Sequence, residues 1–443
     1  IRSRRQRQMC IRDRLIIVAI IPHMKDKNNI SDLKAILDSA QATKEELRSA
    51  SKNQKDESLK KAAESIDSSR ETLKAANEKD MEAASTLNLQ DSFIDRLKLD
   101  DKRIDSMISG LKKVIDLNDP VGEMTDKSTS PSGFLVSKMR VPLGVIGIIY
   151  ESRPNVTADA SALCLKSGNA CILRGGTEAS ETNQAIEKCM IDGLVAVDLP
   201  SEAIQLLKNQ DRELVTQLIK SENQVDLIIP RGGKSLIKVI AENSMVPVLK
   251  HYEGLCHVYV DENADLNKAI DISLNAKVYR YGICGAMETL LVAKSIANEF
   301  LPLIFDEFKK YEVELRGCEK TNEIININLA IEEDWKTEYL EPILSIKVVD
   351  GISEAISHIN HFGSGHTDCI VTEDDSAKKI FLTNVDSSSV MHNLPTCYAD
   401  GFEYGLGAEV GISTDKLHAR GPVGLEGLTS QKFIVEGSGQ LRK

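Results

Sequence analysis

The chain has 443 residues, a formal net charge of −12 and a pI of about 5.3. A chain of this length can bury a large core without metals or disulfides, and its acidic balance argues against a nucleic-acid surface and favours small-molecule chemistry. Nine cysteines are scattered with no C-x-x-C pair. We therefore expect no disulfide framework and no bound metal, and we expect a reducing, cytoplasmic location.

The first residues differ in composition from the rest of the chain. Residues 1–14 contain six arginines, and the apolar run that follows, 15–21, ends at Pro22. This run is too short to span a membrane and lacks a small-residue cleavage site, and we expect no other membrane segment. We interpret 1–23 as an extraneous or unstructured segment, with a mitochondrial presequence as the alternative.

Helices are predicted for residues 30–117. Apolar side chains recur at helical spacing between positions 104 and 115, which predicts an amphipathic helix. Asp100 or Asp101 can cap the start of this helix, and the Asn-Asp-Pro sequence at 118–120 ends it.

A hairpin is predicted after these helices. Residues 122–141 begin with turn-forming residues and end in alternating apolar positions, at Phe134, Val136, Met139 and Val141. Alternation of this kind indicates an exposed antiparallel hairpin. The unpaired edges of such a hairpin need a partner strand.

From residue 144 the pattern changes to short apolar runs separated by segments of helix length. Such runs suit strands that are covered on both faces, and their alternation with helices predicts an α/β fold with a parallel sheet of βαβ units. A helix over 156–167 is expected to end at 167–169 with a left-handed cap. The predicted strands are Val145–Tyr150, Ala170–Leu173, Asp226–Ile229, His257–Val260, Thr289–Val292, Ile343–Val349 and Cys369–Val371.

Two glycine-rich turns are candidates for binding phosphate groups. Each turn follows a predicted strand and leads into a helix, where free backbone N–H groups and the helix dipole favour an anion. Neither turn matches G-x-G-x-x-G, and the earlier glycine of a P-loop would fall at Ile228, so a kinase is not expected. Ordinary turns with solvated basic residues are the alternative. The turns comprise Arg174, Gly175 and Gly176, and Arg231, Gly232 and Gly233.

Cys284 is the candidate nucleophile. It lies between Gly282 and Gly285, in a turn that separates a predicted helix from a predicted strand. Glycines allow a ligand to approach the backbone closely, and a thiol in an open turn can be deprotonated and attack a carbonyl carbon. Spacing alone leaves a structural cysteine as the alternative.

The other cysteines and the histidines are interpreted as structural. His358, His361 and His366 have no carboxylate at a useful spacing, so they do not predict a metal site. Three cysteines lie within helix or strand patterns and are expected in the core. They are Cys164, Cys171 and Cys369.

Eight segments together carry a resemblance to one family: Val141–Gly144, Tyr150–Thr157, Leu173–Gly176, Ile229–Gly233, Cys256–Asp261, Cys284 with Glu288–Leu291, Gly405–Glu409 and Lys416–Pro422. In this combination the chain resembles the gamma-glutamyl phosphate reductases, a branch of the aldehyde dehydrogenase superfamily. The resemblance covers about residues 30–443. Gly285 stands where many members carry Asn, and residues 391–398 also depart from the usual pattern. The resemblance therefore does not assign the residues of the substrate pocket in detail.

The resemblance implies a fold of three parts. A cofactor domain with a Rossmann-like sheet would comprise 24–125 and 142–250, and a catalytic domain that carries the cysteine would comprise 251–425. Strands within 126–141 and 426–443 would form a small oligomerisation sheet, which gives the hairpin its missing partner. We therefore expect a homo-oligomer.

The implied reaction is the NADPH-dependent reduction of L-glutamyl 5-phosphate to L-glutamate 5-semialdehyde and phosphate, in proline biosynthesis. By this resemblance, Cys284 forms a thioacyl intermediate. The backbone N–H of Cys284 and the side chain of Asn155 are then expected to hold the oxyanion.

Binding residues are assigned by the same resemblance. Arg174 and the turn at 231–235 are candidates for the cofactor phosphates, and Glu338 resembles the superfamily glutamate that binds the nicotinamide ribose. Arg280 and Arg420 are candidates for the carboxylate or phosphate of the substrate, since guanidinium matches both groups.

Two alternative functions stay open at this point. An acylating, CoA-dependent aldehyde dehydrogenase of the same superfamily would need a pocket sized for CoA. A catalytically inactive scaffold is the second alternative, and the retained Cys284 and both glycine turns weigh against it. The sequence also leaves open the oligomer size and a stable association with glutamate 5-kinase.

Overall fold

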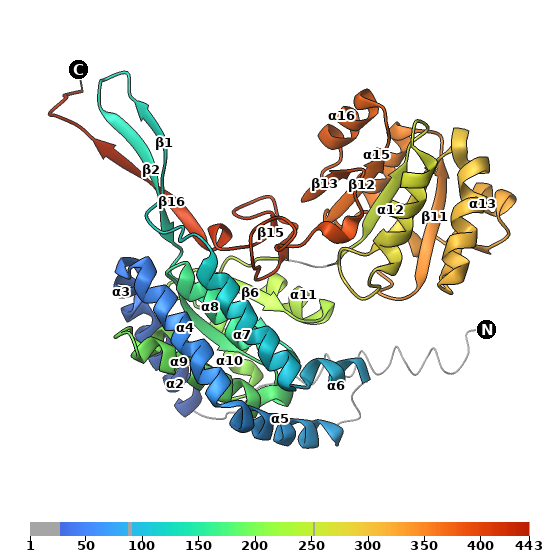
Figure 1. The fold of residues 1–443 in the computed structure, drawn as a ribbon. Coiled ribbons are helices and arrows are strands. Elements are labelled where there is room, and N and C mark those ends of the chain that lie inside the picture. The colour runs from blue at the N-terminus through green and yellow to red at the C-terminus, as the bar shows by residue number, and fades with distance from the viewer. Residues whose placement is uncertain (1–26, 87–90, 251–252, 443) are drawn as a thin grey trace.

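The computed structural model describes residues 27–86, 91–250 and 253–442 (Figure 1). The segment 1–23 lies outside these residues. No helix in the described part of the chain is long and apolar enough to cross a bilayer. The described residues form sheets of four, seven and three strands, together with one short strand pair.

The four-stranded sheet organises the first α/β unit. Its strand order is β5-β4-β3-β6, and every neighbouring pair is parallel. Parallel neighbours require crossover connections, which helices supply here. The elements are β3 (Val145–Tyr150), α8 (Asn155–Lys166), β4 (Ala170–Arg174), α9 (Ser180–Val195), β5 (Ile204–Leu206), α10 (Arg212–Leu218), β6 (Leu227–Arg231) and α11 (Lys234–Asn243).

The N-terminal helices form a layer on this unit, drawn in blue in Figure 1. Helix α4 packs against α9 and α7, and α7 packs against α8. The helices of this layer are α3 (Lys44–Ser49), α4 (Lys52–Ser68), α5 (Arg70–Ser85), α6 (Asp91–Leu97) and α7 (Asp101–Asp116), whereas α2 (Lys27–Ala42) packs against β4, β5 and α10.

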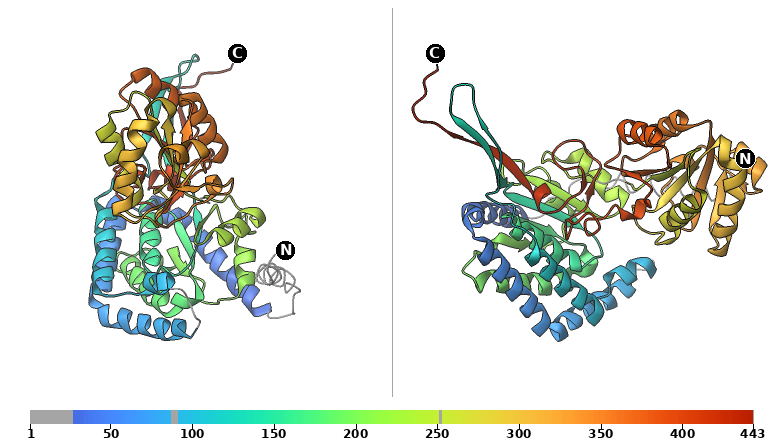
Figure 2. Two further views of the ribbon diagram at one scale, coloured as in Figure 1. Left: turned by 90° about the vertical axis from the view of Figure 1, so that its right-hand side faces the viewer. Right: turned by 45° about the horizontal axis from the view of Figure 1, so that its top comes forward.

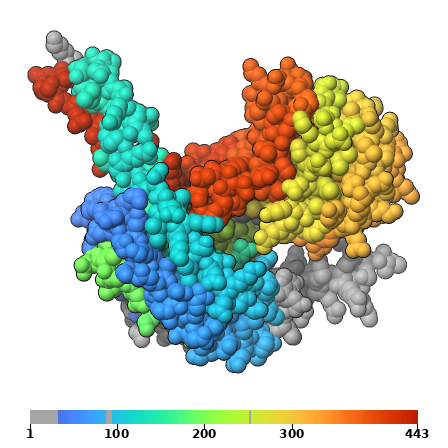
Figure 3. All heavy atoms as spheres, viewed as in Figure 1, coloured from blue at the N-terminus to red at the C-terminus, as the bar shows by residue number. Residues whose placement is uncertain are grey.

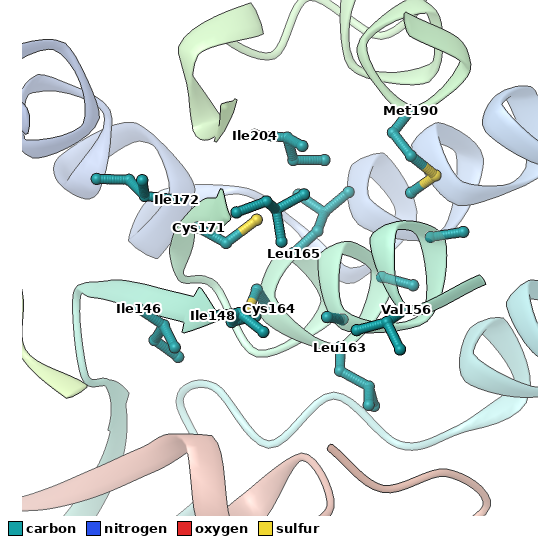
Figure 4. Packing of buried hydrophobic residues seen from close by; sticks show 14 of the residues in the cluster. Ile146, Ile148, Val156, Leu163, Cys164, Leu165, Cys171, Ile172, Met190 and Ile204 are labelled. Atoms are coloured by element: carbon teal, nitrogen blue, oxygen red, sulfur yellow. The ribbon is translucent and has the colours of Figure 1, made fainter. Parts of the chain in front are cut away.

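The core of the first unit lies between α8 and the sheet. Figure 4 shows Ile148 of β3 beside Cys164 of α8, and Cys171 of β4 beside Leu165 of α8. Cys164 and Cys171 are fully buried among them, which confirms their predicted core position. Each fully buried isoleucine in such a core contributes about 2 kcal/mol through removal of apolar surface from water.

The seven-stranded sheet organises the second α/β unit. Its order is β10-β9-β11-β8-β7-β12-β13, and all neighbours are parallel. The strands are β7 (Cys256–Val260), β8 (Met287–Ala293), β9 (Glu314–Gly317), β10 (Asn328–Leu329), β11 (Ile343–Val349), β12 (Thr367–Val371) and β13 (Ser389–His392).

Helices cover both faces of this sheet. Leu290 and Val292 of β8 belong to one apolar cluster, whereas Leu291 belongs to another on the opposite face. Both clusters are buried, which explains why the strands of this unit are apolar throughout and not alternating. The helices are α12 (Leu266–Val278), α13 (Lys294–Lys310), α14 (Glu319–Ile324), α15 (Ile352–Phe362) and α16 (Asp375–Asn384).

The three-stranded sheet projects away from both units (Figures 1 and 2). Strand β2 (Leu135–Pro142) is central and pairs antiparallel with β1 (Met124–Thr129) and with β16 (Thr429–Glu436). The predicted hairpin is therefore confirmed, and its missing partner is the last strand of the chain. The short pair β14 (Ile412–Ser413) and β15 (Gly421–Pro422) precedes β16.

The predicted strands are confirmed, because every predicted apolar run overlaps one of the observed strands. The sequence analysis did not predict β5, β9, β10 or β13. Three of these strands lie at sheet edges, and β9 lies next to an edge. They are only two to four residues long, so they carry no apolar run that stands out from the background.

Two predicted helix ends are also confirmed. Helix α7 begins after Asp100, whose carboxylate accepts the N–H of Arg103 at 3.1 Å. Helix α8 ends at Lys166, and Gly168 just after it has a φ of +74°. The N–H of Asn169 donates to the carbonyl of Cys164 at 2.8 Å, as in a Schellman cap.

Candidate active site

The candidate site lies where the carboxyl ends of the four-stranded sheet meet the amino ends of the seven-stranded sheet. An ion pair between Lys234 of α11 and Glu253, just before β7, joins the two units there. Figure 3 shows the surface hollowed between them. The turns that meet at this level carry Asn155, Arg174 and Arg231 from the first unit, and Gly254, Cys284 and Glu338 from the second.

The backbone of Cys284 is fixed by neighbouring segments. The thiol of Cys256 donates to the carbonyl oxygen of Cys284 at 3.2 Å. A Cβ atom added at Gly254 would lie 1.9 Å from the same oxygen, so only glycine permits this close approach. The turn between α12 and β8 therefore holds Cys284 rigidly, while its side chain remains half-buried and open to the site.

The surroundings of Cys284 favour the neutral thiol. Burial raises the pKa of Cys284 to about 11, and the negative charges of Glu409 and Glu338 add to this shift. Arg231 acts in the opposite direction. The thiol is therefore protonated at neutral pH in this structure, and additional positive charge near the sulfur would favour the thiolate.

Glu409 is a residue whose place near the nucleophile the sequence analysis missed. Its carboxylate accepts the N–H of Gly401 at 3.1 Å. Burial, with the charge of Asp400, raises the pKa of Glu409 to about 6, and Arg231 opposes the shift. Glu409 belongs to a segment that was noted only for its resemblance and its turn character, and nothing in its spacing indicated that it approaches Cys284.

Glu338 and Cys284 are brought together through Gly254. Glu338 Oε1 accepts the N–H of Gly254 at 2.8 Å, and Gly254 lies directly against the Cys284 carbonyl. Burial raises the pKa of Glu338. Glu338, the candidate for binding the ribose, and Cys284, the candidate nucleophile, thus both contact the backbone of Gly254.

Arg174 lies buried at the end of β4. Its guanidinium donates to the carbonyl oxygens of Gly175 and, at 3.1 Å, Gln210. These two hydrogen bonds connect the loops that follow β4 and β5, so the side chain of Arg174 stabilises the backbone in this structure.

The first glycine turn has no room for side chains. A Cβ at Gly175 would lie 2.1 Å from the amide nitrogen of Asn183, and a Cβ at Gly176 would lie 2.1 Å from Glu178 Oε1. The same oxygen of Glu178 accepts the N–H of Ser152 at 2.7 Å. The turns after β3 and β4 are thus locked to each other, and their bare backbone fits the close approach of a cofactor.

The second glycine turn already holds a carboxylate. The N–H of Gly233 donates to Glu151 Oε2 at 2.8 Å, and a Cβ at Gly232 would lie 2.5 Å from that oxygen. Glu151 therefore occupies the N-terminus of α11, where the sequence analysis expected a phosphate. The positive charge of Arg231, at the end of β6, instead lowers the pKa of Cys284 and of Glu409.

Asn155 is the first residue of α8 and is exposed. Its side-chain amide donates to Asp159 Oδ2 at 2.8 Å. Burial raises the pKa of Asp159 to about 6, while the bond from Asn155 and the charge of Arg231 lower it. Asn155 thus lies within the electrostatic surroundings of Arg231, and its amide points along its own helix.

Arginines gather around Cys284 from several segments. Burial lowers the pKa of Arg153, and so does repulsion from three other arginines, whereas Cys284 raises it. Among the described residues, the guanidinium groups of Arg153 and Arg280 have no hydrogen bond or ion pair. Neighbouring guanidinium groups without acidic partners favour an anion between them. The three arginines that act on Arg153 are Arg231, Arg96 and Arg280.

Arg420, the other candidate for the substrate, is engaged elsewhere. Its Nη2 donates to the backbone oxygen and to Oδ1 of Asp386, both at 2.9 Å. Lys416 also binds Asp386. Of the two arginines, the structure brings Arg280 into the group around Cys284 and pairs Arg420 with an acid that follows α16.

A buried ion pair beside the site was also missed. Lys277 of α12 and Glu288 of β8 lie 2.6 Å apart and are fully buried. Burial raises the pKa of Glu288 to about 7 and lowers the pKa of Lys277. The available signal was a lone charged residue inside the apolar run 287–292, which is rare in a strand covered on both faces.

Of the three histidines that were candidates for metal binding, His361 is exposed and the other two are buried. His358 is buried and lies edge-on to Trp335, with ring centroids 5.5 Å apart. His366 is buried, and its Nδ1 lies 2.8 Å from the hydroxyl of Thr367. No group of three or more potential metal ligands occurs within the described ranges.

Comparisons with known proteins agree on one family. A family model described as the aldehyde dehydrogenase family matches residues 20–324. A gamma-glutamyl phosphate reductase from Thermotoga maritima is 45% identical with a TM-score of 0.91, over 93% of this chain and 100% of that one. One from Saccharomyces cerevisiae is 30% identical with a TM-score of 0.52, over 95% and 100%. An acetylating aldehyde dehydrogenase from Geobacillus thermoglucosidasius shares the fold at 16% identity and a TM-score of 0.66, over 95% and 100%.

Proposed function

We propose that this chain, which belongs to the aldehyde dehydrogenase family and within it to the gamma-glutamyl phosphate reductases, reduces L-glutamyl 5-phosphate to L-glutamate 5-semialdehyde with NADPH. The observation that carries the proposal is the half-buried Cys284 at the junction of two α/β units, with guanidinium groups that lack acidic partners nearby. A nucleophilic thiol beside an anion site suits an acyl phosphate. The enzyme is then an oxidoreductase of proline biosynthesis.

Cys284 performs the first step as a nucleophile. The thiol first gives up its proton to solvent, and the thiolate attacks the acyl carbon. The bond from carbon to the phosphate oxygen breaks, and phosphate leaves while a thioester remains on the enzyme. The backbone N–H of Cys284 and the amide of Asn155 stabilise the developing oxyanion, each donor contributing about 3 kcal/mol. Asn155 then exchanges its bond to Asp159 for this oxygen.

Two features of the chain suit a nicotinamide cofactor: the glycine backbone of the two turns and the carboxylate of Glu338. Added Cβ atoms at Gly175, Gly176 and Gly232 would lie within 2.5 Å of neighbouring atoms, and the bare backbone of these turns fits a cofactor that lies against the main chain. Glu338, next to Cys284, would hold the ribose, and the turn around Arg174 would face the phosphates. The turn around Arg231 would do so only after Glu151 releases the N–H of Gly233. When bound, NADPH supplies the hydride that converts the acyl group to the aldehyde.

Arg153 and Arg280 would receive the anionic groups of the substrate. The whole chain carries a net charge of −12, so a local group of arginines is needed to attract an anion against that field. Replacing Arg280 by Ala should raise the KM for phosphate about tenfold or more, as expected when a charge-assisted contact is lost. Arg48→Ala, on the exposed α3, is the matched control and should leave the KM unchanged.

The preference for NADPH over NADH is tested at Arg174. If its guanidinium pairs with the 2′-phosphate, Arg174→Ala loses activity selectively with NADPH. Because Arg174 also ties two loops together, an equal loss with both cofactors would assign it that structural role alone.

We further propose a cytoplasmic homo-oligomer that associates with glutamate 5-kinase. The projecting three-stranded sheet supports the oligomer. The association with the kinase would shorten the path of a labile acyl phosphate, and co-sedimentation of the two purified enzymes tests it.

The reverse reaction gives the sharpest test of the function. Glutamate 5-semialdehyde should reduce NADP only when phosphate or arsenate is present, and Cys284→Ala should abolish turnover while NADPH still binds. Comparable oxidation without phosphate would assign the chain to aldehyde-oxidising enzymes, and rapid CoA-dependent oxidation would assign it to the acylating ones. Cofactor binding with no turnover under any of these conditions would indicate a scaffold.

A further inference from the structure

The buried pair of Lys277 and Glu288 is not explained by stability alone. The Nζ and Oε2 atoms lie 2.6 Å apart, and the two side chains are 0% and 1% exposed. Desolvation of two buried ions offsets most of their attraction, and apolar residues of similar volume are often as stable. In sequence, the turn that carries Cys284 connects these two residues.

The second oxygen of Glu288 holds a strained piece of backbone. Glu288 Oε1 accepts the N–H of Leu340 at 3.1 Å. Leu340 has a φ of +55°, a left-handed conformation that costs a non-glycine residue roughly 1 kcal/mol or more. The side chain of Leu340 is 41% exposed, so packing of that side chain contributes little to this conformation.

The strained backbone leads directly to the site. Glu338, two residues before Leu340, accepts the N–H of Gly254 at 2.8 Å. Gly254 in turn lies against the carbonyl oxygen of Cys284. A continuous series of contacts thus runs from the buried pair through one short loop to the nucleophile.

We infer that the Lys277–Glu288 pair is a positioning device for the loop 337–342, which it holds so that Glu338 faces the cofactor beside Cys284. Lys277 opposes the rise that burial causes in the pKa of Glu288 and so favours its ionised form, and an ionised carboxylate is a stronger acceptor for the Leu340 N–H than a neutral one. The inference rests on the proposed function, because it assigns Glu338 to the cofactor.

Two double variants separate positioning from a merely structural role. Lys277→Met with Glu288→Gln removes both charges and keeps an acceptor for the Leu340 N–H. Lys277→Met with Glu288→Met removes both charges and the acceptor, at similar volume. Thermal unfolding compares their stability, and titration of NADPH fluorescence measures the dissociation constant without any turnover.

The variant without an acceptor should bind NADPH about fivefold more weakly than the variant with Gln, the ratio that corresponds to about 1 kcal/mol for one hydrogen bond. Glu338→Gln should weaken binding in the same direction. Equal dissociation constants for the two double variants would overturn the inference while leaving the proposed function intact. A wild-type protein that binds neither NADPH nor NADH would overturn both.

Hydrogen exchange in the wild-type protein tests the inference even if a double variant does not fold. The amide of Leu340 should exchange slowly, although its side chain is exposed, because it donates to a buried carboxylate. Fast exchange at Leu340 would show that Glu288 does not hold the loop.

Discussion

Cys284 combines a fixed backbone with a thiol that its surroundings keep neutral. Because its pKa is raised to about 11, the thiolate fraction should rise with pH throughout the range from 7 to 9. Alkylation of Cys284 by iodoacetamide, followed by mass spectrometry of its peptide, should therefore accelerate about tenfold per pH unit. A rate that already begins to level off near pH 8.5, as for an unperturbed cysteine, would contradict this environment.

Glu409 contributes to the raised pKa and can be tested separately. Its own pKa is about 6, so it is ionised at pH 8 and repels a thiolate at Cys284. Glu409→Gln should therefore lower the pKa of Cys284 and speed its alkylation at pH 8 several-fold. Glu403→Gln, an exposed substitution in the same segment, is the control and should leave the rate unchanged.

At the scale of residues, the sequence predicted the functional groups that a short local pattern identifies. Cys284 stands between glycines, and the glycine turns follow apolar runs, so their positions follow from the chain alone. Glu409, and the pairing of Lys277 with Glu288, depend on how distant segments meet. Glu409 lies in a different segment from Cys284, and the partner of Lys277 is defined only when α12 packs on β8, so sequence spacing does not identify either contact.

At the scale of elements, the two sheets contribute opposite ends to one site. Open parallel sheets usually bind ligands at the carboxyl ends of their strands, and β3, β4 and β6 follow this rule. The nucleophile, however, lies before β8, at the amino end of its strand. Sequence patterns predicted the βαβ units but could not predict that the ends of one sheet would face the starts of another, since that depends on packing between units.

The cap of α7 gives an element-scale prediction. Asp100→Ala removes the acceptor for the Arg103 N–H and should destabilise the protein by about 1 kcal/mol, or about 1 °C in Tm for a chain of this size. The hydrogen bond from Arg103 lowers the pKa of Asp100. The stabilisation is therefore present above the unfolded pKa of about 3.9 and is lost as pH falls through the lower folded value.

Thermal unfolding at pH 7 and near pH 3 measures this cap. The difference between wild type and Asp100→Ala should shrink at the lower pH. Lys102→Ala, on the exposed side of the same helix, should leave the Tm within the usual range for surface substitutions. Equal unfolding temperatures of Asp100→Ala and wild type at pH 7 would rule out the cap as a stabilising contact.

At the scale of the whole molecule, the three-stranded sheet is an extension that packs against little else within its own chain. It projects from both α/β units (Figure 2), and β16 forms one of its edges. An open edge of this kind is a template for pairing with another chain. Its apolar residues are also exposed: Leu135 by 54%, Phe433 by 68% and Val435 by 58%.

Phe433→Asp should therefore weaken self-association. Burial of one phenylalanine contributes about 2 kcal/mol, so loss of one from each of two copies should raise a dimer dissociation constant about a thousandfold. Light scattering over a range of concentrations would show a smaller mass for the variant than for the wild type. Ile380→Asp, an exposed apolar position on α16, controls for the added charge and should keep the wild-type mass. A wild-type protein that is monomeric and fully active would refute the assignment of this sheet to an interface.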